Sequence, residues 1–196
     1  MFAKDFLALF YPSLCIICAS NLLKHEECIC ISCLHQTPKT DCFINSKNDV
    51  SERFWGRIQL ENAAALFNFN KDGNAQKLIH QLKYEEGKNV GIFLGKQLAY
   101  AINESECFNN IDIVIPVPLH SKKQKLRGYN QSRKKRFSRW ENMMNSFDLR
   151  SSKKLKGKHI LLVDDVITTG STLEACAQKL QEVEGVKVSI ATIAVA

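Results

Sequence analysis

The spacing of apolar positions predicts a strand and two helices in the first half of the chain. Residues 58–69 alternate roughly between apolar and polar, which is typical of a strand, and turn formers follow at 71–74. From residue 75 the apolar positions recur every three or four residues, which predicts a helix ending near Tyr84. A second helix is predicted after Gly87. Its expected buried face is Val90, Phe93, Leu94, Leu98 and Ile102.

Three short apolar runs in the second half predict buried strands. They cover residues 111–117, 160–163 and 186–195. Residues 173–182, between the last two runs, show the three-and-four spacing of a helix. Alternating strands and helices predict an α/β fold with a doubly wound parallel sheet. Ligands of such sheets bind at the carboxyl ends of the strands.

Six of the eight cysteines lie before residue 43 and predict a metal-binding module. Cys15 and Cys18 form one CxxC pair, and Cys30 and Cys33 form another after eleven intervening residues. Four thiolates around one ion are a preferred structural site of Zn²⁺, with no position left open for catalysis. A metal would also stabilise a segment too short to fold on its own core. Free thiols in a loop are the alternative, and the reserve ligands are Cys28, Cys42, His25 and His35.

Length and composition predict one globular domain with a small appendage. The chain has 196 residues, of which 45% are hydrophobic and 24% charged, and these values exclude wholesale disorder. We expect a zinc module at 1–43, a linker at 44–57 and the main domain at 58–196. The apolar stretch at 6–18 is broken by Pro12 and is shorter than the roughly 20 residues that a membrane span needs. It also lacks a signal-peptide cleavage site, so we expect a cytoplasmic protein without membrane insertion.

Candidate chemistry gathers directly after residues 160–163. Asp164 and Asp165 precede a turn rich in hydroxyls and glycine that opens the predicted helix. Backbone N–H groups in such a turn can bind a phosphate, and the helix dipole favours the anion. The carboxylates can accept hydrogen bonds from sugar hydroxyls or hold Mg²⁺ through water. A simple helix N-cap is the alternative, which explains Ser171 or Thr172 but not two adjacent acids. The P-loop and GxGxxG patterns are absent from the sequence.

Residues 161–172, which read LLVDDVITTGST, resemble the 5-phosphoribosyl-1-diphosphate (PRPP) binding motif of type I phosphoribosyltransferases. Other segments make the chain similar to the ComF family in particular. They are the two CxxC pairs, Leu82-Lys83-Tyr84, IPVPL at 115–119 and RGYNQS at 127–132. The resemblance implies a type I phosphoribosyltransferase fold, with Mg²⁺ accompanying PRPP.

The resemblance also implies a role for each matched position. Asp164 and Asp165 would face the ribose hydroxyls and the metal, and Arg127 would help to neutralise the pyrophosphate; these three are the implied catalytic residues. The implied substrate-binding residues are Val163, Asp164, Asp165, Thr168, Thr169, Gly170, Ser171 and Thr172, with Pro116, Val117 and Pro118 at the pyrophosphate loop. The implied reaction is displacement at the anomeric carbon with release of pyrophosphate, and the sequence does not identify the acceptor.

The chain departs from the family pattern after Ser132. A helix, a strand and a flexible catalytic loop are expected before a segment like residues 133–147, yet Arg133 follows directly. A deletion here would remove the loop that shields the reaction from water. If a stretch is instead missing from the sequence, transferase activity remains possible.

The charge balance favours a polyanionic partner. The chain carries 27 Lys and Arg against 20 Asp and Glu, a net charge of +7. Nine of the cations lie between residues 122 and 139, and Tyr129, Phe137 and Trp140 are interleaved or adjacent, which is typical of a surface for single-stranded nucleic acid. A solvated face, or cations that serve the pyrophosphate, is the alternative. The family's link to DNA uptake implies single-stranded DNA and a transport helicase as partners. A non-catalytic competence factor is therefore the second hypothesis.

Overall fold

The structure of the protein is a computed structural model that describes residues 12–84, 87–117 and 154–196. Several predicted features lie outside these ranges. They are Pro118, Arg127, the junction after Ser132 and the run of cations at 122–139. The account of the fold and of the candidate sites below therefore concerns the described ranges alone.

Four parallel strands form the sheet, in the order β1-β4-β3-β2. The strands are β1 (Ala63–Asn68), β2 (Ile113–Pro116), β3 (His159–Ile167) and β4 (Lys187–Val195). In the central strand β4, all residues after Lys187 are buried. Strands covered on both faces have such continuous apolar runs because neither side contacts water. The predicted α/β fold with a parallel sheet is therefore confirmed.

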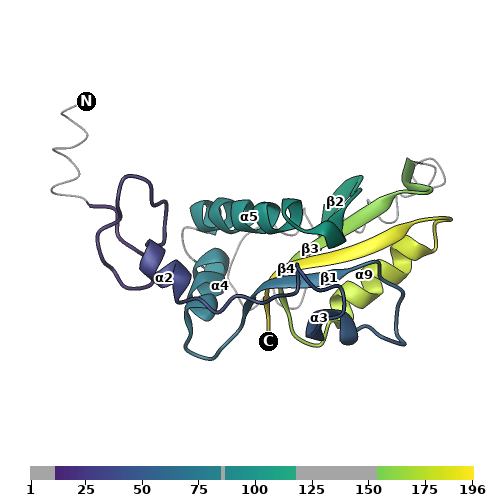
Figure 1. The fold of residues 1–196 in the computed structure, drawn as a ribbon, viewed down its shortest axis with the longest axis horizontal. Helices are drawn as coiled ribbons and strands as arrows, with labels where there is room; N and C mark the ends of the chain where they lie inside the picture. The colour runs from purple at the N-terminus through teal and green to yellow at the C-terminus, as the bar shows by residue number, and fades with distance from the viewer. Residues whose placement is uncertain (1–11, 85–86, 118–153) are drawn as a thin grey trace.

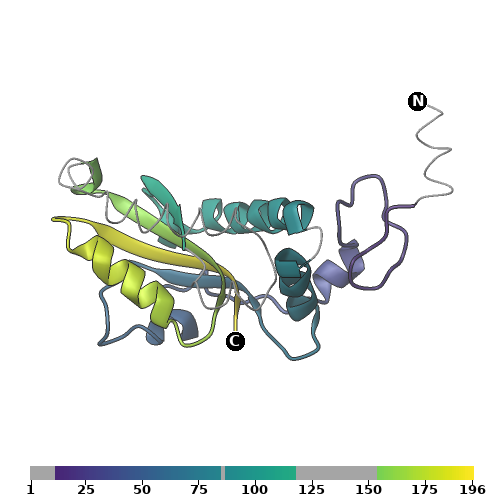
Figure 2. The same ribbon diagram turned by 180° about the vertical axis from the view of Figure 1, so that it is seen from behind.

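Helices cover both faces of this sheet (Figures 1 and 2). Helix α5 (Gly87–Asn103) lies on one face, and α9 (Ser171–Gln181) lies on the other together with the short α3 (Asp49–Glu52). Helix α4 (Asn74–Tyr84) packs on α5 and lies between the sheet and the N-terminal module in both views. The predicted face of α5 is buried at Val90, Phe93, Leu94 and Leu98.

Strand β3 differs from its prediction because it continues through both aspartates. The sequence pattern ends the strand at Val163, but parallel pairing with β4 continues at Asp164↔Thr192 and reaches Ile167↔Val195. Backbone pairing with a central neighbour extends the strand although its side chains are no longer apolar. The two carboxylates therefore lie inside the last part of β3, and the turn begins only at Thr168.

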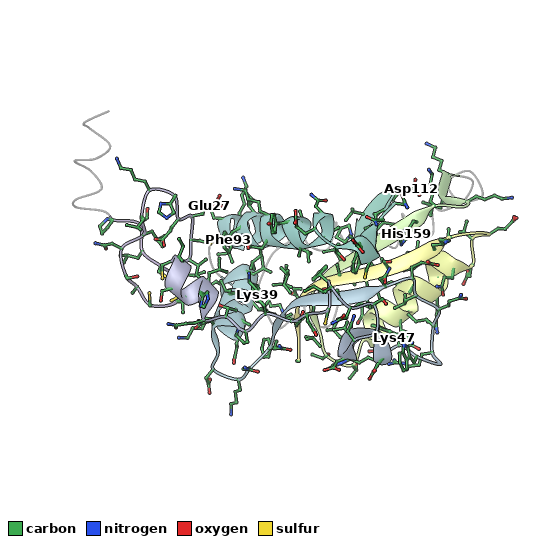
Figure 3. The ribbon with its side chains drawn as sticks, in the orientation of Figure 1. Glu27, Lys39, Lys47, Phe93, Asp112 and His159 are labelled. Atoms are coloured by element: carbon green, nitrogen blue, oxygen red, sulfur yellow. The ribbon has the colours of Figure 1, made fainter. Side chains whose placement is uncertain are left out.

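The N-terminal module contains one short helix, α2 (Ile31–His35), which starts inside the second CxxC pair. Two of the contacts between the module and the rest of the protein involve α4 and α5. The Asn74 side-chain amide, at the start of α4, donates a hydrogen bond to the backbone carbonyl of Cys33 at 3.1 Å. Lys96 of α5 forms an ion pair with Glu27, which is labelled in Figure 3. Over the part of the chain that the structure describes, none of the helices is both long and apolar enough to cross a membrane.

The segment predicted as a linker contains helix α3. Asn48 caps this helix: its side-chain oxygen accepts hydrogen bonds from the N–H groups of Val50 and Ser51, both at 3.0 Å. The Ser51 hydroxyl accepts the N–H of Asn48 in return, which completes a capping box. Val50 and Phe54 are buried at 0% and 1% exposure, so this segment is part of the core.

Candidate functional site

Residues 168–170 connect β3 to α9 at the carboxyl edge of the sheet, and together with the first two residues of α9 they form what we call the 168–172 turn. Gly170 is the N-cap of α9 and has a left-handed backbone with φ +76°, a conformation that favours glycine. As a glycine, this N-cap residue makes no side-chain hydrogen bond to the helix. The N-cap is therefore Gly170, and neither Ser171 nor Thr172 has the simple N-cap role that we considered. The Ser171 N–H has a distant side-chain acceptor, Thr169 Oγ1 at 3.5 Å, and the N-cap glycine supplies none, so the N–H groups at the start of α9 can bind an anion.

The two aspartates just before this turn have different surroundings. Asp165 Oδ2 lies 3.1 Å from the Lys83 ammonium of α4. Asp164 Oδ1 accepts the backbone N–H of Asp165 at 2.8 Å. Burial first, and then the negative charge of Asp164, raise the pKa of the Cys176 thiol on α9 to about 11. Asp165 is thus linked to α4, whereas the charge of Asp164 acts on α9.

The end of β2 lies beside these aspartates. Pro116 pairs with Val163 in the register of the sheet, and the Val117 N–H donates to the Val163 carbonyl at 2.8 Å. Ligands of parallel sheets bind at this edge. The structure therefore brings the predicted residues of β2, of β3 and of the 168–172 turn to one edge, and Pro118 and Arg127 lie outside the described residues.

Two arginines that the sequence analysis did not single out donate hydrogen bonds to backbone carbonyls of the turn. Arg53 donates to the Thr168 carbonyl at 2.5 Å, and Arg57 donates to the Thr169 carbonyl at 3.2 Å. Arg57 also forms an ion pair with Glu174 in the first turn of α9. The sequence does contain a local pattern for the short helix that precedes these arginines. Asn48 followed by Ser51 is a capping-box pattern, and Val50 and Phe54 are apolar at helical spacing.

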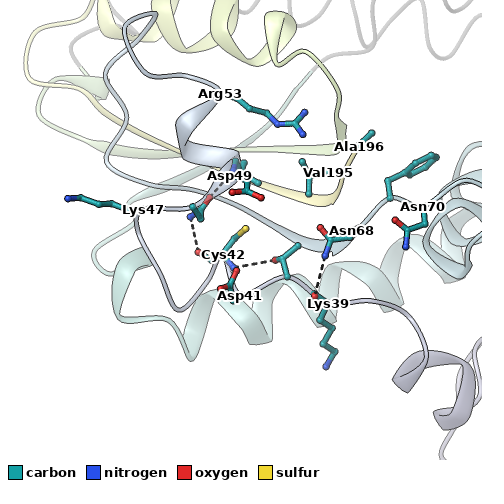
Figure 4. Close-up of a pocket in the computed structure, with 14 residues that line it drawn as sticks. Lys39, Asp41, Cys42, Lys47, Asp49, Arg53, Asn68, Asn70, Val195 and Ala196 are labelled. Atoms are coloured by element: carbon teal, nitrogen blue, oxygen red, sulfur yellow. Dashed lines mark hydrogen bonds between the residues drawn. The ribbon is translucent and has the colours of Figure 1, made fainter.

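A cleft of about 650 Å³ opens where β1 and β4 end (Figure 4). Lys39, Lys47, Asn68 and Asn70 line it together with Arg53, which also contacts the turn. Most of the lining side chains are polar or charged, including Asp41 and Asp49, so the cleft suits a polar ligand better than an apolar one. The sequence did not predict this cleft because one wall comes from the segment interpreted as the end of the module and the linker.

The four predicted thiol ligands come together in the N-terminal module. The Sγ atoms of Cys15, Cys18, Cys30 and Cys33 all lie within 4.8 Å of one another, so they could hold a metal ion. Hydrogen bonds from the side chain and the backbone of Ser20 lower the pKa of Cys18 to about 6, which favours the thiolate that a metal needs. Burial raises the pKa of Cys33, and bound metal would have to displace that proton.

The reserve ligands do not join this cluster in the described part of the chain. Cys28 is not part of the group of four, and burial first, then the negative charge of Glu27, raises the pKa of its thiol to about 11. Cys42, His25 and His35 are also absent from the group of four. The composition of the cluster fits Zn²⁺, which prefers four thiolates in structural sites.

Comparison with known proteins gives one family match and several relatives. The phosphoribosyl transferase domain family matches residues 91–195. The chain is 28% identical to the DNA utilization protein YhgH of Escherichia coli (strain K12) over 136 residues, which covers 53% of this chain and 59% of the relative. It is 28% identical to Competence protein F of Haemophilus influenzae over 139 residues, which covers 54% and 61%. No solved structure matches the chain.

The chain spans about three fifths of the length of these curated relatives. It is also shorter than they are inside the matched region. The alignment with the E. coli protein has 136 positions, whereas 53% of 196 residues is about 104. About 32 aligned positions therefore hold no residue of this chain. A shortfall of this kind is expected from the departure from the family pattern after Ser132.

Proposed function

The chain belongs to the phosphoribosyl transferase domain family, and on that premise we propose that it binds PRPP together with Mg²⁺ at the carboxyl edge of its sheet. One observation carries the proposal: the N-terminus of α9, whose N-cap is a glycine, and the Asp164–Asp165 pair lie at the same edge. A phosphorylated sugar needs both an anion site and acceptors for its hydroxyls. Purely apolar ligands need neither.

The 168–172 turn is the proposed site of the 5-phosphate. Its backbone N–H groups, with the hydroxyls of Thr168, Thr169, Ser171 and Thr172, would donate hydrogen bonds to the phosphate oxygens, and the dipole of α9 would favour the negative charge. Thr168, Thr169, Ser171 and Thr172 are exposed, so these hydroxyls can reach a ligand. The residues at the end of β2, Pro116 and Val117, would border the pyrophosphate.

Asp164 and Asp165 are the proposed acceptors for the ribose 2- and 3-hydroxyls. Carboxylate oxygens are also the donors that Mg²⁺ prefers, and both side chains are only partly buried, so the residues present fit this ion. When bound, Mg²⁺ would neutralise charge on the pyrophosphate. The Lys83 ammonium already supplies a positive charge at Asp165.

Transfer of the phosphoribosyl group to an acceptor is the proposed activity. The acceptor nucleophile would form a bond to the anomeric carbon and give up a proton, while the bond from that carbon to the pyrophosphate breaks and the pyrophosphate leaves with the electron pair. Arg127 would help to stabilise the departing charge. Because the shortfall within the matched region would affect shielding from water, PRPP binding is the primary proposal and turnover the second step.

Calorimetric titration with PRPP, with and without Mg²⁺, tests the binding step. We expect Asp164→Asn and Asp165→Asn each to weaken binding roughly tenfold or more, because each removes a charge-assisted hydrogen bond. Asp112→Asn is the matched control, because it removes an acid at the amino edge of the same sheet. A titration of the unaltered protein without heat, or one that both variants leave unchanged, contradicts the proposal. Release of pyrophosphate with candidate acceptors measures turnover.

We also propose that the four thiols of the N-terminal module bind one structural Zn²⁺. The cluster has four sulfur donors and no further ligand position, which is the composition of structural rather than catalytic zinc. The module contacts both α4 and α5, so the metal would stabilise a segment that packs against the main domain. Its role would be to fold the module.

A non-catalytic role in DNA uptake is the second candidate function. Two observations favour it: relatives carry the names DNA utilization protein and Competence protein F, and the net charge is +7. Here the chain would bind single-stranded DNA and a transport helicase in the cytoplasm and use PRPP as a regulator. Fluorescence anisotropy with a labelled single strand tests this, because phosphate contacts lose affinity steeply between 50 and 200 mM salt. Absent or salt-independent binding contradicts it.

A further inference from the structure

The segment from Asn48 to Arg57 is fixed to the sheet at one end and to the 168–172 turn at the other. The Asn48 side-chain amide donates to the Ala63 carbonyl at 3.1 Å, which ties the capping box of α3 to the start of β1. Asn48 itself is buried at 8% exposure. The residues that follow α3 therefore start from a fixed point on the sheet when they reach the turn.

The two arginines of this segment fix the direction of two peptide groups in the turn. Arg53 binds the Thr168 carbonyl and Arg57 binds the Thr169 carbonyl, so both oxygens point toward the arginines. No cis peptide bond is present in the described residues. In a planar trans peptide the N–H points opposite to the carbonyl of the same unit. The N–H groups of Thr169 and Gly170 therefore point away from the arginines.

Arg57 also links the turn to the helix that follows it. One nitrogen of its guanidinium donates to the Thr169 carbonyl and to the Arg53 carbonyl, at 3.2 and 3.0 Å. The second terminal nitrogen, Nη2, forms an ion pair with Glu174 on α9. One planar side chain thus holds three groups from the turn, from α9 and from its own segment. A lysine has a single ammonium nitrogen and lacks this planar fork.

Phe54 fixes the left-handed residue of the turn. Its ring is buried at 1% exposure and lies so close to Gly170 that a Cβ there would be 2.9 Å from two ring carbons. The ring therefore packs directly on the backbone of Gly170, which has φ +76° and begins α9. The position of the first helical N–H groups depends on this contact.

We infer that Arg53, Phe54 and Arg57 are positioning residues that hold the 168–172 turn in its phosphate-binding conformation before any ligand arrives. The inference rests on the proposed function for its ligand. A carbonyl turned toward a phosphate would repel it, and the arginines hold both carbonyls on the opposite side. Donors fixed in advance lose no conformational freedom on binding, which strengthens the bound state.

Backbone order parameters of the ligand-free protein test the positioning without any ligand. We expect the amides of residues 169–172 to have values near the rigid limit of about 0.85, and Arg57→Ala to lower them to about 0.6. Lys158→Ala is the matched control, because it removes an exposed ion pair with Asp112 at the other edge of the sheet and should leave the turn unchanged. Unchanged order in Arg57→Ala overturns the inference even if PRPP binds.

Affinities for two probes then test the consequence for binding. Ribose 5-phosphate would use the turn, whereas pyrophosphate with Mg²⁺ would not. We expect Arg57→Ala to weaken ribose 5-phosphate about tenfold and pyrophosphate less than twofold, with Arg57→Lys intermediate for ribose 5-phosphate. Equal weakening of both probes indicates general damage and overturns the inference, as does an unchanged affinity for ribose 5-phosphate. If the unaltered protein binds neither probe, the proposed function fails, and the order parameters still decide whether the arginines position the turn.

Discussion

The Lys83 ammonium on α4 lies 3.1 Å from Oδ2 of Asp165 on β3. Both side chains are about one fifth exposed, at 21% and 23%, so water screens the pair only partly. Lys83 belongs to the Leu82-Lys83-Tyr84 segment, which sequence alone marked without giving it a role. The structure gives it one: α4 supplies the positive charge beside a carboxylate of the candidate sugar site.

Replacing this lysine tests whether it competes with a metal ion for Asp165. We expect Lys83→Met to tighten Mg²⁺ binding about threefold, because a partly exposed ion pair contributes about 0.5 to 1 kcal/mol. PRPP binding without Mg²⁺ should weaken by a similar factor. Calorimetry with each ligand measures both effects. Lys77→Met, on the same helix, is the control, because Lys77 has no ion pair with Asp165. Equal Mg²⁺ affinities in the two variants contradict the idea.

Substituting two glycines that have similar backbone angles distinguishes the cost of conformational strain from the cost of a steric clash. Gly157 has φ +69° and no atom within 4 Å of the place that a Cβ would take, whereas Gly170 has φ +76° and the Phe54 ring at 2.9 Å from that place. We expect Gly157→Ala to cost about 1 kcal/mol of unfolding free energy from left-handed strain alone. Gly170→Ala should cost about 3 kcal/mol, because the buried ring must also move. Urea denaturation measures both, and equal losses would show that Phe54 does not restrict the turn.

Zinc content identifies the metal ligands one cysteine at a time. We expect Cys15→Ser, Cys18→Ser, Cys30→Ser and Cys33→Ser each to lose the metal, because each removes one of four clustered thiols. Cys42→Ser and Cys28→Ser should keep one Zn²⁺ per chain, measured by elemental analysis of the purified protein. Loss of zinc from Cys28→Ser, with the fold intact by circular dichroism, would show that Cys28 is a ligand after all.

The pH dependence of stability reports on an ion pair at the amino edge of the sheet. Asp112, labelled with His159 in Figure 3, accepts a hydrogen bond from Lys158 at 2.8 Å and another from the His159 N–H at 2.9 Å. The Lys158 ammonium first, and then the His159 N–H, lower the pKa of Asp112. A lowered pKa in the folded state stabilises the protein above the unfolded pKa of about 3.9, and the contribution is lost as the pH falls through the folded pKa.

Asp112→Asn should therefore have a lower urea midpoint than the unaltered protein at pH 6 to 7. The difference should shrink as the pH falls from about 4 through the lowered pKa of Asp112, below which the carboxylate of the unaltered protein is protonated as well. Urea titrations at a series of pH values measure this. A difference that stays constant down to the acid limit would mean that the charge of Asp112 does not stabilise the fold.

Local patterns predicted most of the elements, because helix and strand periodicity depends on which face is buried. The apolar spacing of Val90, Phe93 and Leu94 indicated the buried face of α5. The end of β3 was wrong because the apolar run stops at Val163, whereas backbone pairing with β4 continues past the aspartates. Pairing between distant strands does not depend on that local pattern. The division into module, linker and main domain stays a prediction.

The candidate sites differ in the same way. Each CxxC pair directs two thiols to one point by local geometry, so the spacing of Cys15, Cys18, Cys30 and Cys33 predicted their cluster. Arg57 contacts residues more than 110 positions away along the chain. Nothing in the sequence near Arg57 indicates which carbonyl it binds. Residues that support a site from a distant segment are therefore the part that sequence patterns alone miss.

The Cys33 carbonyl accepts hydrogen bonds from two different parts of the chain. The Thr37 hydroxyl donates from within the module at 2.8 Å, and the Asn74 amide donates from α4 at 3.1 Å. A chimera that carries the N-terminal module of a relative on this sheet would need a hydrogen-bond acceptor at the same place for Asn74. The module and α4 therefore depend on each other, and exchanging one without the other would lose this hydrogen bond between them.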